Sequence, residues 1–186
     1  MIELVTGGAR SGKSRFAQAE AARLDGMIGY IATAQAFDEE MRARIQKHRQ
    51  DRPATWRTFE GHRDLAEFLY RNPEIDTWLL DCVTLWITGL MFDLGGEWMQ
   101  PASERVEQAE KLVAAQVQAL LQAAEKREKH LILVTNEVGM GLVPESAFGR
   151  IFRDIAGRAN QRIAARADAV YFMVSGIPLQ IKGAQR

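Results

Sequence analysis

The sequence predicts one α/β domain, built on a mostly parallel β-sheet with helices on both faces. Short, nearly continuous apolar runs recur along the chain, and longer segments of helical periodicity separate them. Strands that are apolar on both faces are typical of parallel sheets covered on both sides by helices. The chain has 186 residues, and no linker, repeat or low-complexity tract divides it, so residues 1–186 are expected to form a single domain.

The predicted strands are the apolar runs at residues 2–6, 27–33, 77–83, 130–135 and 169–174. Helices are expected after Gly12, from near Asp38, from near Gly61, and over residues 103–129 and 146–166. After the last run, Ser175 and Gly176 predict a turn, and residues 179–182 predict a short returning strand. Because Pro178 has no N–H to donate, this C-terminal hairpin is expected at an edge of the sheet.

The segment 103–129 has the clearest helical pattern. Apolar side chains recur on one stripe, and charged side chains occupy the other side. Ser103, which follows Pro101 closely, is the expected N-cap. The stripe consists of Val106, Ala109, Val113, Val117, Leu120, Leu121 and Ala124.

Composition excludes several classes of partner. Lys plus Arg and Asp plus Glu both number 24, so the net charge of zero gives no bulk attraction to nucleic acid or anionic lipid. Cys82 is the only cysteine, which excludes an intramolecular disulfide and fits a cytoplasmic setting. No stretch approaches the ~18 apolar residues of a membrane-spanning helix, so membrane insertion is not expected.

A phosphate-binding motif directly follows the first predicted strand. It reads G-x-x-x-x-G-K-S and leads into a helix-forming segment. The glycines let successive backbone N–H groups point toward a phosphate, the helix directs its positive end there, and Lys13 reaches the β- and γ-phosphates. The alternative, a glycine-rich turn without a ligand, does not account for the complete motif in this context. Nucleoside-triphosphate binding is therefore predicted for Gly7, Gly8, Ala9, Arg10, Ser11, Gly12, Lys13 and Ser14.

Magnesium (Mg²⁺) is expected beside this loop, held by the Ser14 hydroxyl and by Asp81 near the end of the third apolar run. The alternative interpretation makes Asp81 the N-cap of the next helix. Two D-x-x-G matches, at Asp93 and Asp154, do not follow strands, and no N-K-x-D segment exists. A regulatory GTPase is therefore not predicted, and the loop alone indicates a P-loop kinase or NTPase.

A histidine lies in the segment between the second and third apolar runs. On a helix, Met41, Ile45 and His48 share the less charged face, and this inserted helix is expected over about residues 36–60. Cationic neighbours suit an approaching polyphosphate, and a neutral imidazole can attack phosphorus. By spacing alone, a hydrogen-bonded packing role for His48 is the alternative. His62 and His130 have weaker claims to a catalytic role.

Five segments together resemble one family, the bifunctional adenosylcobinamide kinases and adenosylcobinamide-phosphate guanylyltransferases of the CobU/CobP type. The resemblance covers essentially the whole chain in order, and its specificity rests on the combination rather than on the P-loop. The matching segments are V-T-G-G-A-R-S-G-K-S from Val5, Y-I-A-T-A from Tyr30, H-x-x-x-R-P-x-x-W-x-T-x-E from His48 to Glu60, T-N-E-V-G-M-G-L-V-P from Thr135, and R-D-I-A-G-R-A-N-Q from Arg153.

The resemblance implies a RecA-like fold, a homotrimer and two linked activities. The first phosphorylates the aminopropanol hydroxyl of adenosylcobinamide, with ATP or GTP as the donor. The second transfers GMP from GTP to the resulting phosphate through a GMP-histidine intermediate on His48, and releases pyrophosphate and then adenosyl-GDP-cobinamide. ATP, GTP and the corrinoid are thus the small-molecule substrates, with no nucleic acid partner.

The resemblance also implies GTP contacts outside the P-loop. We add the hypothesis that the Glu60 carboxylate reads the N1–H and N2–H₂ donors of guanine. The implied contacts are at Ala32, Thr33, Ala34, Arg49, Gln50, Asp51, Arg52, Glu60 and Cys82.

Several alternatives stay open from the sequence. A single-activity P-loop small-molecule kinase would use Lys13 and Asp81 and leave His48 with a structural role, and a non-catalytic nucleotide-binding module would transfer nothing. Residues 136–141 either approach the corrinoid through their glycines or form an ordinary strand-to-helix turn. The sequence leaves the general base of the kinase step unassigned.

Overall fold

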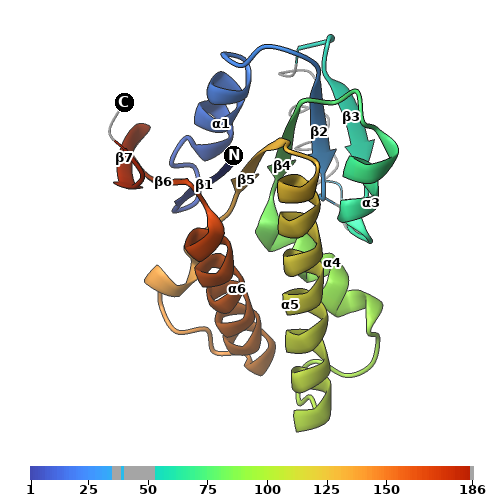
Figure 1. The fold of residues 1–186 in the computed structure, drawn as a ribbon. Helices are drawn as coiled ribbons and strands as arrows, with labels where there is room; N and C mark the ends of the chain where they lie inside the picture. Colours follow the sequence, from blue (N-terminus) through green and yellow to red (C-terminus); the bar gives the residue numbers. More distant parts are fainter. Residues whose placement is uncertain (35–38, 40–52, 185–186) are drawn as a thin grey trace.

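Seven strands form one sheet in the computed structural model, which describes residues 1–34, 39 and 53–184. The strand order is β3-β2-β4-β5-β1-β6-β7, in which the first six strands are parallel and β7 is antiparallel to β6 (Figure 1). The predicted class, a mostly parallel α/β sheet with a C-terminal hairpin, is confirmed. The strands are β1 (Ile2–Gly7), β2 (Ile28–Ala32), β3 (Arg57–Glu60), β4 (Thr77–Asp81), β5 (His130–Val134), β6 (Ala169–Val174) and β7 (Ile177–Lys182).

Helices cover both faces of this sheet, and each face has its own buried cluster. On one face, α1 (Lys13–Ala21) buries Ala17 and Ala21 against the strands. The long helices α5 and α6 lie side by side on the other face (Figure 1). The helices of that second face are α3 (Leu65–Arg71), α4 (Val83–Asp93), α5 (Ser103–Lys126) and α6 (Ala147–Arg166).

Successive residues of the central strands alternate between the two clusters. On β4, Trp78 and Leu80 pack with the helices α3 to α6, whereas Leu79 belongs to the cluster on the α1 face. On β5, Leu133 packs with the helices α3 to α6, and Ile132 belongs to the cluster on the α1 face. A strand covered on both faces needs an apolar residue at every position, which explains the continuous apolar runs.

The structure corrects several boundaries, and α5 ends at Lys126 and β7 begins at Ile177 rather than at residues 129 and 179. The run at residues 77–83 is a strand only as far as Asp81, because Val83 begins α4. Ser103 is the first residue of α5, and Ala102 rather than Ser103 occupies the N-cap position. The expected helix at 36–60 is wrong at its C-terminal end, where Arg57–Glu60 form β3.

Strand β3 escaped prediction because it has no continuous apolar run. Among the described residues it pairs only with β2, at one edge of the sheet, and three of its four residues are exposed. Polar, exposed residues are typical of edge strands. Strand β7 forms the opposite edge of the sheet. It contains Pro178, and its edge position is the one predicted from the missing N–H of that residue.

In the part of the chain that the structure describes, no helix combines the length and apolarity needed to cross a bilayer.

Candidate functional site

The P-loop occupies the turn between β1 and α1. Gly12 has φ 94° at the N-cap position of α1, a conformation that glycine adopts without strain. The Lys13 side chain is buried, and its Nζ donates to the Gly8 carbonyl at 2.5 Å and lies 3.5 Å from Ser11 Oγ. The ammonium group therefore lies against the loop, where the β- and γ-phosphates bind in such motifs.

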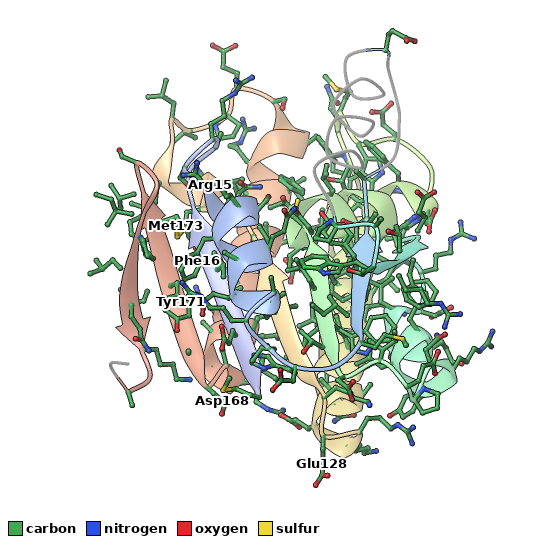
Figure 2. All side chains as sticks on the ribbon, turned by 90° about the horizontal axis from the view of Figure 1, so that it is seen from above. Arg15, Phe16, Glu128, Asp168, Tyr171 and Met173 are labelled. Carbon is green, nitrogen blue, oxygen red and sulfur yellow. The ribbon has the colours of Figure 1, made fainter. Side chains whose placement is uncertain are left out.

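The turn between β6 and β7 supports this loop from one side. The Gly176 N–H donates to the Ser11 carbonyl at 2.9 Å. A Cβ on Gly12 would lie 3.2 Å from the Gly176 Cα, so the two backbones are in close contact. Below the turn, Phe16 on α1 packs against Tyr171 on β6, with ring centroids 5.0 Å apart (Figure 2). The C-terminal hairpin thus fixes the position of the P-loop, a role that the sequence did not reveal.

Asp81 is the last residue of β4 and lies at the carboxyl ends of the parallel strands, as the P-loop does. Its Oδ2 accepts a hydrogen bond from Tyr30 Oη at 2.9 Å. Cys82, not Asp81, occupies the N-cap position of α4, which argues against a capping role for Asp81. In the strand order only β5 lies between β4 and β1, so Asp81 stands two strands from the P-loop.

Thr33 and Cys82 form a buried pair beside Asp81. The Thr33 hydroxyl donates to the Cys82 carbonyl at 2.8 Å and accepts from the Cys82 N–H at 2.9 Å. Burial raises the pKa of the Cys82 thiol, and the neighbouring Asp81 carboxylate adds to that rise. The thiol is therefore neutral and a poor nucleophile.

A chain of hydrogen-bonded side chains continues from this pair toward the P-loop. Cys82 Sγ lies 3.1 Å from the Thr84 hydroxyl, which accepts from Asn136 Nδ2 at 2.8 Å. Asn160 Nδ2, on α6, then donates to the main-chain carbonyl of Asn136 at 3.2 Å.

This series of hydrogen bonds ends at Glu137. Its Oε1 lies 3.4 Å from Asn160 Nδ2 and accepts from the Thr6 hydroxyl on β1 at 2.6 Å. Sequence reasoning assigned no site role to Thr6, Thr84 or Asn160. Thr6 lies near the end of β1 and Thr84 in the first turn of α4, whereas Asn160 lies in the interior of α6. The available signal was that Thr6 and Asn160 stand within the family-like segments.

Glu60 lies apart from the P-loop. It ends β3, whereas the P-loop follows β1, and three strands lie between them. Four strand spacings of about 4.8 Å separate the two by roughly 19 Å. Glu60 and the P-loop both lie at the carboxyl ends of the parallel strands. Ala32, Thr33 and Ala34 lie at the same end of the sheet, at and after the end of β2, which pairs with β3.

His48 and its neighbours Arg49, Gln50, Asp51 and Arg52 lie outside the described residues. Of the other histidines, His62 Nε2 lies 2.8 Å from Asp93 Oδ2, and His130 Nε2 lies 3.2 Å from Glu3 Oε1. A hydrogen bond from Arg63 lowers the pKa of Asp93 to about 2, and His62 adds to this effect. Both histidines therefore have a carboxylate as a hydrogen-bond partner.

Oxygen donors suited to Mg²⁺ are present at two positions. Magnesium is held in proteins by one or two carboxylates, with substrate phosphates and waters completing its coordination. Ser14 in the first turn of α1 and Asp81 at the end of β4 offer such donors. Across residues 1–34, 39 and 53–184, no cluster of three His, Cys, Asp or Glu residues would hold a metal without a substrate.

The segment that follows β5 presents exposed apolar side chains near the carboxyl ends of the parallel strands. A short 3₁₀ helix, η1 (Val138–Met140), follows Glu137. Exposed side chains follow, with 72% of Met140, 95% of Leu142 and 67% of Val143 accessible to solvent. The root of this segment is fixed beside the P-loop, because the Glu137 N–H donates to the Gly7 carbonyl at 3.2 Å.

Comparison with known proteins agrees with this geometry. A family model described as cobinamide kinase / cobinamide phosphate guanyltransferase matches residues 3–181. The bifunctional adenosylcobalamin biosynthesis protein CobU of Escherichia coli is 48% identical over 184 residues, covering 98% of this chain and 100% of that protein. The CobU protein of Salmonella typhimurium has the same identity and coverage, and the CobP protein of Pseudomonas aeruginosa is 42% identical, covering 98% of each chain. The chain therefore belongs to the CobU family of cobinamide kinases and cobinamide phosphate guanyltransferases.

Proposed function

We propose that this enzyme phosphorylates adenosylcobinamide and then transfers GMP from GTP to the product, giving adenosyl-GDP-cobinamide. One observation carries the proposal within this family: Lys13 on the P-loop and Asp81 on β4 flank the end of β5 at one edge of the sheet. Open parallel sheets bind their ligands at this edge. Because ATP and GTP are cytoplasmic metabolites, the function also implies a cytoplasmic enzyme.

In the phosphorylation step, the P-loop N–H groups and Lys13 bind and orient the triphosphate. Ser14 and Asp81 are the residues that would hold Mg²⁺, which supplies positive charge to the phosphates when bound. The acceptor hydroxyl attacks the γ-phosphorus in line with the leaving diphosphate. Lys13 stabilises the negative charge that develops between the β- and γ-phosphates in the transition state.

In the GMP-transfer step, His48 divides one difficult displacement into two. An imidazole nitrogen attacks the α-phosphorus of GTP, a phosphorus–nitrogen bond forms, and pyrophosphate leaves. An oxygen of the acceptor phosphate then attacks the same phosphorus, and the phosphorus–nitrogen bond breaks. The cationic residues Arg49 and Arg52 supply charge for the polyphosphate.

Product analysis distinguishes this proposal from a single-activity kinase. Adenosylcobinamide with ATP is expected to give adenosylcobinamide phosphate, and later addition of GTP is expected to give adenosyl-GDP-cobinamide, separated by chromatography. If the phosphate accumulates and GTP never converts it, the single-activity kinase is the better account. If neither product forms under conditions where nucleotide binds, the chain is a binding module.

We also propose that the exposed apolar residues Met140, Leu142 and Val143 contact the corrinoid acceptor. Their place beside the P-loop and their exposure support this, because a large, partly apolar substrate buries such side chains. Leu142→Ser is expected to raise the KM for adenosylcobinamide about tenfold, since it removes roughly 1–2 kcal/mol of apolar contact. The KM for ATP serves as the internal control, and an equal rise in both constants would contradict the assignment.

A homotrimer is the proposed assembly. Strand β7 supports this, because Ile177, Leu179 and Ile181 at the sheet edge are each more than half exposed. Apolar side chains on an edge strand are usually covered, since an uncovered edge favours aggregation. Sedimentation equilibrium is expected to give three times the chain mass, whereas a stable single-chain mass would contradict this assembly.

A further inference from the structure

We propose that Glu137 is the general base of the phosphorylation step, accepting the proton of the acceptor hydroxyl as that hydroxyl attacks the γ-phosphate. This proposal rests on the proposed function and names the group that the sequence left unassigned.

The sheet topology puts Glu137 between the two groups that bracket the transferred phosphate. Lys13 follows β1, Asp81 ends β4, and β5 is the strand between them. Lys13 contacts the β- and γ-phosphates in such motifs, and Asp81 would hold the Mg²⁺ that accompanies them, so the γ-phosphate is expected near the end of β5. Glu137 follows that strand, and its N–H donates to the Gly7 carbonyl at 3.2 Å, so its backbone adjoins the first residue of the P-loop.

Buried neutral side chains hold the Glu137 carboxylate in one orientation. Thr6, 4% exposed, donates to Oε1 at 2.6 Å, and Asn160, 7% exposed, has its Nδ2 at 3.4 Å from the same oxygen. Asn160 is itself oriented by the Thr135 hydroxyl, which donates to its Oδ1 at 2.7 Å.

The second carboxylate oxygen of Glu137 is available to an acceptor. Within the described parts of the chain, both of its side-chain hydrogen bonds go to Oε1. The residue is only half-buried, so part of it is accessible to a ligand. A fixed carboxylate with one open oxygen is the geometry that proton acceptance requires.

The proposed step balances without a further reactant. The acceptor oxygen forms a bond to the γ-phosphorus, the bond from that phosphorus to the β–γ bridging oxygen breaks, and the nucleoside diphosphate leaves. The hydroxyl proton goes to Glu137 Oε2 and then to water. Asp81 is less suited to this role, because its Oδ2 already accepts from Tyr30 and its position is that of the metal ligand.

The GMP-transfer step has no need of this base. Its acceptor is a phosphate monoester, whose second proton dissociates near pH 6, so the attacking oxygen is already anionic near neutral pH. Loss of the base should therefore separate the two reactions.

The test is Glu137→Gln in the full-length enzyme, with Glu145→Gln on the exposed part of the same segment as the matched control. Phosphorylation of adenosylcobinamide is expected to fall about 100-fold in kcat. GMP transfer to supplied adenosylcobinamide phosphate is expected to stay within about threefold of the wild-type rate, as is the Kd for ATP. The control variant is expected to retain both rates.

The pH profile gives an independent readout. A base must be deprotonated, so the wild-type phosphorylation rate falls on the acid side, and Glu137→Gln is expected to lose that fall. Among the described residues, Lys13 and Asp81 are charged groups that the neighbouring elements bring to this end of the sheet, and both remain in the variant. Unchanged phosphorylation, an unchanged acid limb, or a parallel loss of both reactions would overturn the proposal. Failure of the wild-type enzyme to phosphorylate adenosylcobinamide would instead overturn the proposed function.

Discussion

Lys13→Ala is expected to abolish phosphorylation of adenosylcobinamide, with a loss on the order of 10³-fold in kcat. The Lys13 ammonium is buried against the Gly8 carbonyl and Ser11, so its charge acts at a site from which much of the water is excluded. No other side chain of the P-loop motif can replace it, because Arg10 is exposed on the loop. The measurement is the steady-state rate of corrinoid phosphorylation at saturating ATP.

The matched control for this prediction is Lys111→Ala. Lys111 lies on the exposed side of α5, where it pairs with Glu107 at 2.7 Å, far in sequence from the motif. An exposed ion pair of this kind contributes little, so the rate should stay within about twofold of the wild-type value. Full phosphorylation activity in Lys13→Ala would contradict the P-loop assignment.

His48→Ala is expected to eliminate GMP transfer, with a loss on the order of 10⁴-fold or more, because it removes the attacking nitrogen rather than a stabilising contact. Phosphorylation of adenosylcobinamide is expected to remain, since that step uses Lys13 and the P-loop. Both rates are measured on one enzyme preparation with the two acceptors supplied separately.

His62→Gln is the matched histidine control. His62 interacts with Asp93 at the C-terminal end of α4, and its substitution should leave both rates near the wild-type values. Equal loss of GMP transfer in the two variants would show that the effect is structural. Parallel loss of both reactions in His48→Ala would contradict separate chemical roles for His48 and Lys13.

The central part of the fold was predictable because its strands are buried on both faces. Residues such as Trp78, Leu79 and Leu80 must all be apolar, and this leaves a continuous run in the sequence. The apolar stripe of α5 was equally clear, and Ala109, Val113 and Val117 are buried as predicted. Edge strand β3 was missed because Arg57, Thr58 and Glu60 face solvent and produce no such signal.

The candidate site was predictable only where its residues are close together in the sequence. The P-loop is one short motif, so its residues and its lysine follow from spacing alone. The contact between Gly176 and Ser11 joins residues that are 165 positions apart in the sequence, and no local pattern encodes it. Glu137 was visible as a motif residue, but its partners Thr6 and Asn160 come from different elements, so its fixed orientation needs the folded chain.

The most direct test of the account is incubation of the enzyme with GTP labelled at its α-phosphate. A phosphorus–nitrogen bond to histidine is labile in acid and stable in alkali, so the protein should carry a label with that behaviour. The account predicts that peptide mapping places this label on His48, that added adenosylcobinamide phosphate removes it, and that His48→Ala never acquires it. Absence of protein label from an enzyme that still forms adenosyl-GDP-cobinamide would contradict the GMP-histidine mechanism.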